Sequence, residues 1–230
     1  MISVIIPTYE EERFLTGCLS ALKKCRTNDY EIIIVDAGSK DKTLSIADSF
    51  GCRIVIGKKT GVGNARNAGA AAARGDIIAF LDADSVPCEN WLDIVEETFR
   101  RNLQVSAIGG PTDHGSLRYR IANFQFWLNP VTKHLGFFYF SGNNSAFRKG
   151  FFSSFGGYKP ILCEDVELSL RMSRCSERML FVRAMEMRLS PRRFERQGFF
   201  RTQMRWLGSD LKIFLGIHEP GEGYGSEIKG

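Results

Sequence analysis

GVGNARNAGAAAARGDIIAFLDADS, residues 61–85, joins a helical pattern directly to a strand pattern. The alanine-rich part, 61–75, lies between glycines and is typical of a helix, whereas DIIAFL is a short apolar run typical of a buried strand. That run leads into Asp82 and Asp84. The stretch therefore predicts a helix, then a strand, with two carboxylates at the carboxyl end of the strand.

The same alternation continues on both sides of this stretch. Apolar, β-branched runs predict further strands at 3–7, 31–37, 52–57 and 105–110. Amphipathic patterns between them predict helices at 11–25, from a cap at Asp41 to Phe50, and at 89–102. Strands that are apolar throughout, separated by helices, indicate an α/β fold with a mostly parallel central sheet and helices on both faces.

The pattern becomes less regular after about residue 110. A strand-like run at 137–149, a helix opening at Glu164 and a last basic helix at about 194–215 are predicted there. Since neither a linker nor a repeat separates the parts, we expect one domain with two halves. The first half is 1–110, the second is 111–216, and 217–230 would be a tail.

Composition places the chain among ordinary globular proteins. Of its 230 residues, 43% are hydrophobic and 25% charged, which suits one large α/β domain. The six cysteines form no CxxC pair, which favours reduced thiols in the cytoplasm. The three histidines, at 114, 134 and 218, have no spacing typical of metal ligands. No apolar run reaches the ~20 residues of a membrane span, and the start lacks the basic region of a signal peptide.

The formal net charge of +5 is unevenly distributed. Residues 171–205 are strongly basic, with phenylalanine and methionine interspersed. The sequence leaves four interpretations of this region open: contact with the phosphates of a ligand, contact with nucleic acid, peripheral attachment to an anionic membrane at its cytoplasmic face, or a solvated helix face.

Polar residues follow directly on the predicted strands. Thr8, Asp36, Asp82 and Asp84 all stand at carboxyl ends, where ligands bind in open parallel sheets, so they are expected to converge. Asp82 and Asp84 could hold a hard cation such as Mg²⁺ or Mn²⁺, which completes its shell with water and phosphates; alternatively, they cap a helix. Asp36 could bind a nucleobase or ribose, or form an Asx turn.

The second half offers a candidate base and a candidate closing segment. Glu164 and Asp165 open a helix, where acidic side chains complement the helix dipole, but Asp165 could also act as a general base toward a hydroxyl group. Arg205 and Trp206 could offer a phosphate contact and a flat face for a sugar. The alternative is a buried tryptophan with the arginine stem packed over it.

Six motifs in a fixed order give these signals a common explanation. They are SVIIPTYEEERFL (3–15), EIIIVDAGSKDKT (31–43), 61–85, SGNNSAFRKGFFSSFGGY (141–158), CEDVELSLRM (163–172) and QMRW (203–206). As an ordered set they resemble glycosyltransferase family 2, whose members are inverting, use nucleotide sugars and have the GT-A fold. The resemblance extends over residues 1–210.

The resemblance implies that 1–110 is the half that binds the nucleotide-sugar donor and that 111–216 is the half with the acceptor side and the catalytic base. It also implies a role for each matching position. Donor binding would fall to Pro7, Thr8, Glu10, Glu11, Asp36, Arg66 (near Gly61 and Asn67), Asp82 and Asp84. Of these, Asp84 and Asp82 would also hold the divalent metal, Mg²⁺ or Mn²⁺. Asp165 would be the catalytic base, and the acceptor and closing side would consist of Glu164, Arg205 and Trp206.

Three features depart from the family pattern. Ala37 replaces the usual second aspartate after the second strand, which leaves base or ribose contact to Asp36 alone. Thr202 stands where processive polysaccharide synthases carry glutamine, which argues against a processive polymerase. Residues 111–140 match no recognisable pattern, and acceptor specificity would be expected there.

The expected function is metal-dependent, inverting transfer of a sugar from a nucleoside-diphosphate sugar to a hydroxyl group. A UDP-sugar is favoured over a GDP-sugar, and the acceptor is a carbohydrate or a lipid-linked compound. Two alternatives remain at this point. A sugar nucleotidyltransferase would carry a glycine-rich basic loop after the first strand, but this loop reads TYEEERFL. The second alternative is a non-catalytic module that binds nucleotide sugars or nucleic acid, but such a module would need no base at Asp165. We do not expect nucleic acid to be a partner.

Overall fold

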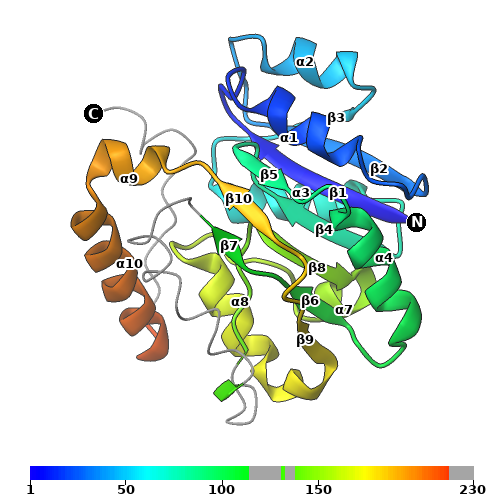
Figure 1. The fold of residues 1–230 in the computed structure, drawn as a ribbon. Helices are drawn as coiled ribbons and strands as arrows, with labels where there is room; N and C mark the ends of the chain where they lie inside the picture. Colours follow the sequence, from blue (N-terminus) through cyan, green and yellow to red (C-terminus); the bar gives the residue numbers. More distant parts are fainter. Residues whose placement is uncertain (114–130, 133–137, 218–230) are drawn as a thin grey trace.

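A seven-stranded sheet forms the centre of the computed structural model, which describes residues 1–113, 131–132 and 138–217 (Figure 1). Across the sheet the strands follow the order β3 (Arg53–Ile56), β2 (Tyr30–Asp36), β1 (Ile2–Thr8), β4 (Ile77–Leu81), β8 (Asn144–Arg148), β6 (Ala107–Gly109) and β9 (Met179–Phe181). Strands β3, β2, β1 and β4 are parallel, β8 is antiparallel to both its neighbours, and β6 and β9 are parallel. The predicted mostly parallel α/β sheet is confirmed.

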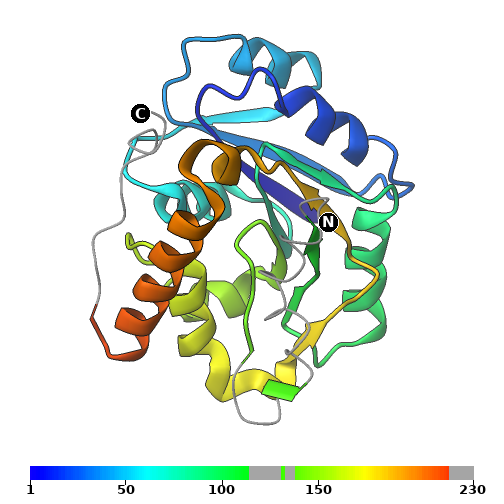
Figure 2. The same ribbon diagram turned by 60° about the vertical axis from the view of Figure 1, so that its left-hand side comes forward.

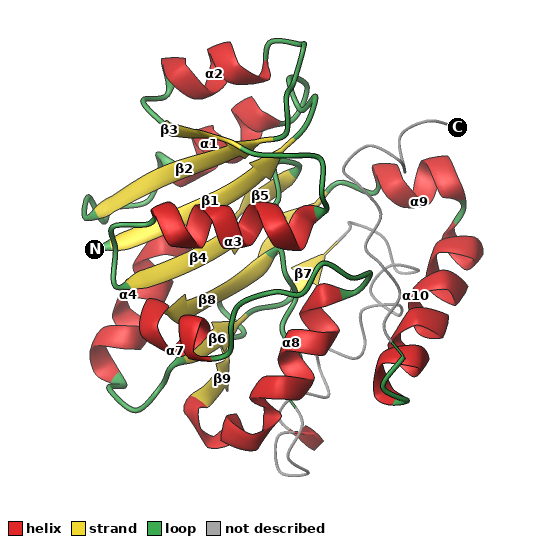
Figure 3. Ribbon diagram, turned by 180° about the vertical axis from the view of Figure 1, so that it is seen from behind, coloured by secondary structure: helices red, strands yellow, loops and turns green. Residues whose placement is uncertain are grey.

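Helices cover both faces of this sheet. On one face lie α1 (Leu15–Leu22) and α4 (Trp91–Arg101), and α2 (Thr43–Ser49) lies beyond α1 (Figure 1). On the other face lie α3 (Val62–Ala72), α7 (Lys149–Ser154) and α8 (Glu164–Met172), as Figure 3 shows. The α8 helix continues into a 3₁₀ turn, Ser173–Arg178.

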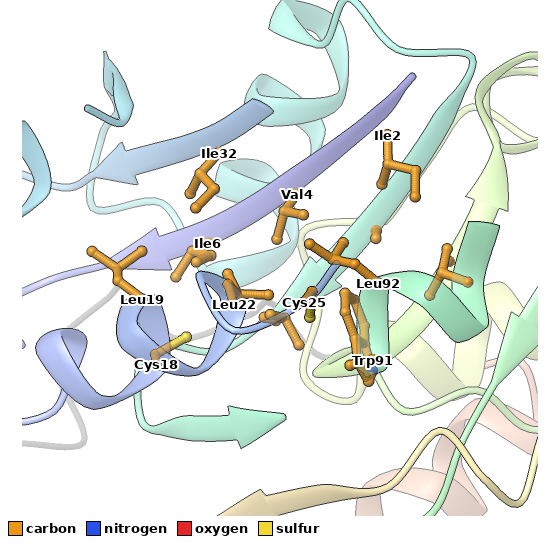
Figure 4. Packing of buried hydrophobic residues seen from close by; sticks show 14 of the residues in the cluster. Ile2, Val4, Ile6, Cys18, Leu19, Leu22, Cys25, Ile32, Trp91 and Leu92 are labelled. Atoms are coloured by element: carbon orange, nitrogen blue, oxygen red, sulfur yellow. The ribbon is translucent and has the colours of Figure 1, made fainter. Parts of the chain in front are cut away.

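The hydrophobic core follows the two-residue period of the strands. Ile2, Val4 and Ile6 of β1 point toward α1 and α4, where Trp91 is fully buried (Figure 4). Ile5 points the other way, into a cluster with α3, α7 and α8. Since alternate residues of a strand face opposite sides, an apolar strand is buried on both faces, as the sequence pattern requires.

A small second sheet determines where the acidic pair lies. It comprises β5 (Ser85–Pro87), β10 (Met187–Leu189) and β7 (Thr112–Asp113); β10 is antiparallel to β5 and parallel to β7. The chain therefore leaves β4 at Leu81, turns, and enters β5 at Ser85. The Ser85 amide donates to the Asp82 carbonyl at 3.0 Å, so Asp82 and Asp84 lie in this turn. The Ser190 amide donates to the Asp84 carbonyl at 3.2 Å, which holds the end of β10 beside it.

The C-terminal region differs from the prediction. The single helix expected at about 194–215 is two helices, α9 (Arg192–Gln197) and α10 (Phe199–Phe214). They are separated at Gly198, whose φ of 80° lies in the left-handed region that glycine adopts readily and other residues rarely do. The strand expected at 137–149 is also shorter, since β8 covers only Asn144–Arg148.

Both parts of the chain contribute to the central sheet, because β8 and β9 pair with β4 and β6. Most of the segment 111–140 and the tail from residue 218 onward lie outside the described residues. No helix in the described part is both long and apolar enough to cross a bilayer.

Candidate active site

Carboxylate side chains gather at the carboxyl edge of the parallel strands. Thr8 and Asp36 end β1 and β2 as register partners, and Asp82 follows β4 directly. The loop after β1 is tied to the loop after β2, since the Glu10 amide donates to Ser39 Oγ and the Glu11 amide to Thr43 Oγ1, both at 2.8 Å. The first two strands and β4 therefore present one continuous acidic rim.

Asp36 is engaged in forming its own loop. Its carboxylate accepts hydrogen bonds from the Thr8 and Ser39 hydroxyl groups and from the amides of Gly38 and Ser39, at 2.5–3.0 Å. The residue is fully buried. This is the Asx-turn arrangement, in which the carboxylate shapes the turn. Of its neighbours on this rim, Pro7 is buried within β1, and Glu10 is exposed with a φ of 55°.

Arg66 connects the two halves of the site. The α3 helix places it in the interior, 3% exposed, where Nη2 donates to Asp82 at 2.8 Å and Nη1 to Glu164 at 2.5 Å. Burial by itself lowers the pKa of Arg66, but the carboxylates of Asp82 and Glu164 outweigh it and raise that pKa. A buried guanidinium between two carboxylates satisfies the requirement that buried charges be paired. It also brings the end of β4 against the start of α8.

Gly142 lies directly over this guanidinium. A Cβ atom at position 142 would stand 2.4 Å from Arg66 Nη1 and 2.8 Å from Cζ, closer than atoms approach without a shift. The absence of a side chain therefore lets the backbone before β8 approach Arg66. From there the Gly142 amide reaches Asp165 Oδ2, at 3.1 Å.

Asp165, the candidate base, is oriented by donors from two segments. Its Oδ2 accepts from the Tyr139 hydroxyl and the Gly142 amide, each at 3.1 Å, and its Oδ1 from the Val166 amide at 2.9 Å. Beside it, burial raises the pKa of Glu164, and Arg66 opposes this. The first turn of α8 thus holds one carboxylate, Glu164, that is paired with a guanidinium and another, Asp165, that accepts hydrogen bonds from a hydroxyl group and two backbone amides.

Arg192 is a site residue that the sequence reasoning missed. As the first residue of α9, it forms a bidentate pair with Glu11 at 2.6 and 2.7 Å, and its Nε lies 2.8 Å from Asp84 Oδ2. Burial raises the pKa of Glu11, although Arg192 opposes it. Arg192 is one of many arginines in the basic region, and only the pairing of β10 with β5 brings it to the acidic turn.

Asp210 is a second missed residue. It lies on α10, close enough to Asp165 for the two charges to interact. Burial, and then the nearby Asp165 charge, raise the pKa of Asp210 to about 6, although a hydrogen bond with the Cys163 thiol lowers it. The sequence motif drew attention to the preceding Arg205 and Trp206 instead.

The structure places Arg205 and Trp206 on α10. Arg205 is half-buried, and the Trp206 ring packs edge-on against Phe194 of α9, with centroids 5.5 Å apart. Trp206 is half-buried, so the roles considered for Arg205 and Trp206 stay predictions.

The acidic turn after β4 is the candidate place for a metal ion. Among the described residues, no three side chains of His, Cys, Asp or Glu group together as a metal site; His114, His134 and His218 lie outside that part. Asp82 and Asp84 nevertheless fit a hard cation that takes few protein ligands, since they offer carboxylate oxygens from a single turn. The Asp82 side chain is 32% exposed, and Asp84 is paired with Arg192, which a cation would have to replace.

Comparison with known proteins identifies the class. Residues 3–158, more than half of the chain, match the family described as Glycosyl transferase family 2. The chain belongs to this family.

Curated relatives resemble parts of the chain. A PGL/p-HBAD biosynthesis glycosyltransferase of Mycobacterium bovis is 40% identical over 90 residues, 36% of this chain and 35% of that protein. Glycosyltransferase AglE of Haloferax volcanii is 36% identical over 100 residues, 40% of this chain and 33% of that protein. The matches thus span about a third of the length of these relatives.

Solved structures confirm the GT-A fold. Glucosyl-3-phosphoglycerate synthase from Mycobacterium tuberculosis, in complex with Mn²⁺, UDP and glucosyl-3-phosphoglycerate, aligns with a TM-score of 0.68 at 20% identity, covering 94% of this chain and 80% of that one. S. aureus TarS 1–349 in complex with UDP-GlcNAc aligns with a TM-score of 0.63 at 18% identity, covering 82% of this chain and 58% of that one. At these identities, the likeness concerns the fold.

Proposed function

We propose that this glycosyltransferase moves a sugar from a UDP-sugar to an acceptor hydroxyl group, with inversion at the anomeric carbon and with a divalent cation bound at Asp84 and Asp82. The observation that carries the proposal is the link through Arg66, which brings the acidic turn after β4 against the start of α8. The donor side and the candidate base are thereby held together by a buried contact.

The donor would bind along the rim formed by the ends of β1, β2 and β4. Thr8, Glu11 and the loop shaped by Asp36 would border the nucleotide. UDP is favoured over GDP because folds of this kind have been solved with UDP and with UDP-GlcNAc. Since the Asp36 carboxylate is taken up within its own turn, we propose that it acts on the base by shaping the loop.

A cation held by Asp84 and Asp82 would offset the negative charge that develops on the departing diphosphate. Either Mg²⁺ or Mn²⁺ suits oxygen ligands; Mn²⁺ is present in one structural relative. Arg192 pairs with Asp84 in the structure, so its guanidinium is close enough to assist at the same phosphates once Asp84 binds the cation.

Asp165 would accept the proton of the acceptor hydroxyl group. The hydroxyl oxygen then forms its bond to the anomeric carbon as the bond from that carbon to the diphosphate oxygen breaks, and the diphosphate leaves from the opposite side. Only one displacement takes place, so the configuration inverts. Tyr139 and Gly142 hold the carboxylate in a fixed orientation for this transfer. Glu164, whose charge is neutralised by Arg66, would belong to the acceptor side, together with Arg205 and Trp206.

The test is a thermal-shift screen of UDP- and GDP-sugars with and without Mn²⁺. A ligand at a hundred times its Kd stabilises the folded protein by about 2.7 kcal/mol, which is easily measured. We expect UDP-sugars to stabilise the protein in a Mn²⁺-dependent manner, and Asp84→Asn to abolish the Mn²⁺ dependence. Stabilisation by UDP-sugars that is the same with and without the cation would contradict the metal role.

The acceptor is proposed to be a carbohydrate or a lipid-linked compound. Contact with a membrane, one of the interpretations of the basic C-terminal region, is a separate proposal.

A further inference from the structure

The α10 helix exposes a row of large apolar side chains, whereas two of its three buried residues are polar. The large apolar side chains of its outer side are each more than half exposed to solvent. They are Phe200, Met204, Leu207, Leu211 and Phe214, here called the α10 apolar face. The buried residues of the same helix are Thr202, Ser209 and Ile213. A surface helix ordinarily does the opposite, burying its apolar stripe and exposing its polar one.

The spacing of these residues makes a continuous stripe. Successive members are separated by four, three, four and three positions, so they lie along one side of the helix over its whole length. The C-cap residue, Leu215, is 68% exposed and extends the stripe. Single exposed apolar residues are common on protein surfaces, but a contiguous stripe of this size marks an interaction site.

Basic residues lie along one edge of this stripe. Arg201, Arg205 and Lys212 fall on one side of the helix, between the apolar face and the side that packs against the molecule. From residue 192 to residue 217 the sequence holds six basic and two acidic residues. An apolar face bordered by lysine and arginine is the pattern of helices that lie in the interface of an anionic bilayer. A second copy of this chain would instead bring these like charges together.

The position of α10 fits such a contact. The helix runs along the outside of the molecule, beside α8 and after α9 (Figures 1 and 2). The helix packs against α8, whose first turn carries Asp165, and Asp210 lies close enough to Asp165 for the two charges to interact. A surface bound by the outer side of α10 would therefore lie next to the candidate acceptor site.

We propose that the α10 apolar face, together with its basic edge, binds the surface of a membrane containing anionic lipid, and so places the acceptor side of the enzyme at that surface. The surface itself does not depend on the proposed function; only the statement about the acceptor rests on it.

The test is co-flotation of the purified chain with vesicles of phosphatidylcholine alone and of phosphatidylcholine with phosphatidylglycerol. We expect flotation with the anionic vesicles and at least tenfold weaker partitioning into the neutral ones. In the double variant Leu207→Glu and Leu211→Glu, partitioning into anionic vesicles should fall at least tenfold. The double variant Arg201→Gln and Lys212→Gln should reduce it and weaken its dependence on salt concentration.

A matched control separates the surface from a general effect of acidic substitution. Leu103→Glu changes a leucine that is 77% exposed and follows the end of α4, and it should leave flotation unchanged. Figure 1 shows α4 and α10 on opposite sides of the molecule. Unfolding temperature and UDP-sugar binding, measured for every variant, show whether it folds and whether the donor site is intact.

Three results would overturn the proposal. They are no flotation of the unmodified chain with anionic vesicles, equal flotation of the Leu207→Glu and Leu211→Glu variant, and a concentration-dependent dimer that the same variant dissociates. The last would assign the face to a second copy of the chain. UDP-sugar binding is measured separately for every variant. A failure of the proposed function, seen as loss of UDP-sugar binding, is therefore distinguishable from a failure of the membrane-binding proposal.

Discussion

Individual charged residues at the acidic rim are held in pairs, and this has measurable consequences. Arg192 is shared between Glu11 and Asp84, and Glu11 is almost fully buried. Removing one member of such a pair leaves a carboxylate without its partner in a poorly solvated place, which costs more than the pair itself contributes.

Arg192→Gln should therefore lower the free energy of unfolding, by about 1–3 kcal/mol after allowance for the partial exposure of the arginine. Added Mn²⁺ should recover more of this stability in the variant than it adds to the unmodified protein, because Asp84 no longer has a competing cation. Arg188→Gln, an exposed arginine of the adjacent β10, is the control and should behave as the unmodified protein does. If Mn²⁺ stabilised Arg192→Gln and the unmodified protein equally, this would contradict the idea that Arg192 and the cation compete for Asp84. Chemical denaturation with and without Mn²⁺ measures both effects.

Asp210 predicts a pH dependence of stability. Its pKa is about 6 in the folded protein, against an ordinary 3.8, so between these values the folded state holds a proton that the unfolded state has lost. The free energy of unfolding should therefore fall as pH rises from about 4 to 6, and change no further from this cause above that.

Asp210→Asn removes the titrating group. Relative to the unmodified protein, the variant should gain about 1–2 kcal/mol between pH 4 and pH 7, a figure reduced for the partial exposure of Asp210. Urea denaturation at both pH values measures it, with the exposed Asp48→Asn as control. A difference that is the same at pH 4 and pH 7 would show that Asp210 titrates normally.

At the scale of elements, the segment before β8 depends on one close approach. Gly142 packs on Arg66, which Asp82 and Glu164 hold from both sides, so the guanidinium cannot move away from an added methyl group. Gly142→Ala should cost about 1–3 kcal/mol of stability and lower turnover, because the displaced backbone amide no longer orients Asp165.

The control is Gly150→Ala in α7, where an added Cβ atom meets nothing within 4 Å. Alanine in a helix with free space should be neutral or slightly stabilising. Thermal unfolding and turnover of the two variants, compared side by side, measure the close approach. Equal behaviour of the two would mean that the segment tolerates a side chain at position 142.

Some elements were readable from the sequence, and others were not. The strands from β1 to β4 are short apolar runs with clear punctuation, so their existence and order followed from pattern alone. The division of the last helix at Gly198 was missed because a single glycine inside a helical pattern is often tolerated. The contacts of Arg192 and Asp210 were missed because they depend on β10 and α10 packing against distant parts of the chain, which no local pattern encodes.

At the scale of the whole molecule, one rule was sufficient to predict that Thr8, Asp36 and Asp82 lie at the same edge of the sheet. It states that ligand-binding polar residues follow the carboxyl ends of parallel strands. The same rule could not show that the Asp36 carboxylate accepts hydrogen bonds from its own turn. The hydroxyl and amide groups that donate these bonds become adjacent to it only in the folded loop.

The central proposal is that the two halves of the molecule meet at one site. There Asp165 would accept the proton of the acceptor hydroxyl group, whose oxygen attacks the anomeric carbon of a UDP-sugar. The most direct measurement is the rate of UDP release with Mn²⁺ and a carbohydrate acceptor that the unmodified chain uses. This rate is compared between the unmodified chain and Asp165→Asn. We expect turnover to fall by about 10²–10⁴ in the variant, while UDP-sugar binding and unfolding temperature are retained. Unchanged turnover in a folded, donor-binding Asp165→Asn variant would contradict the account.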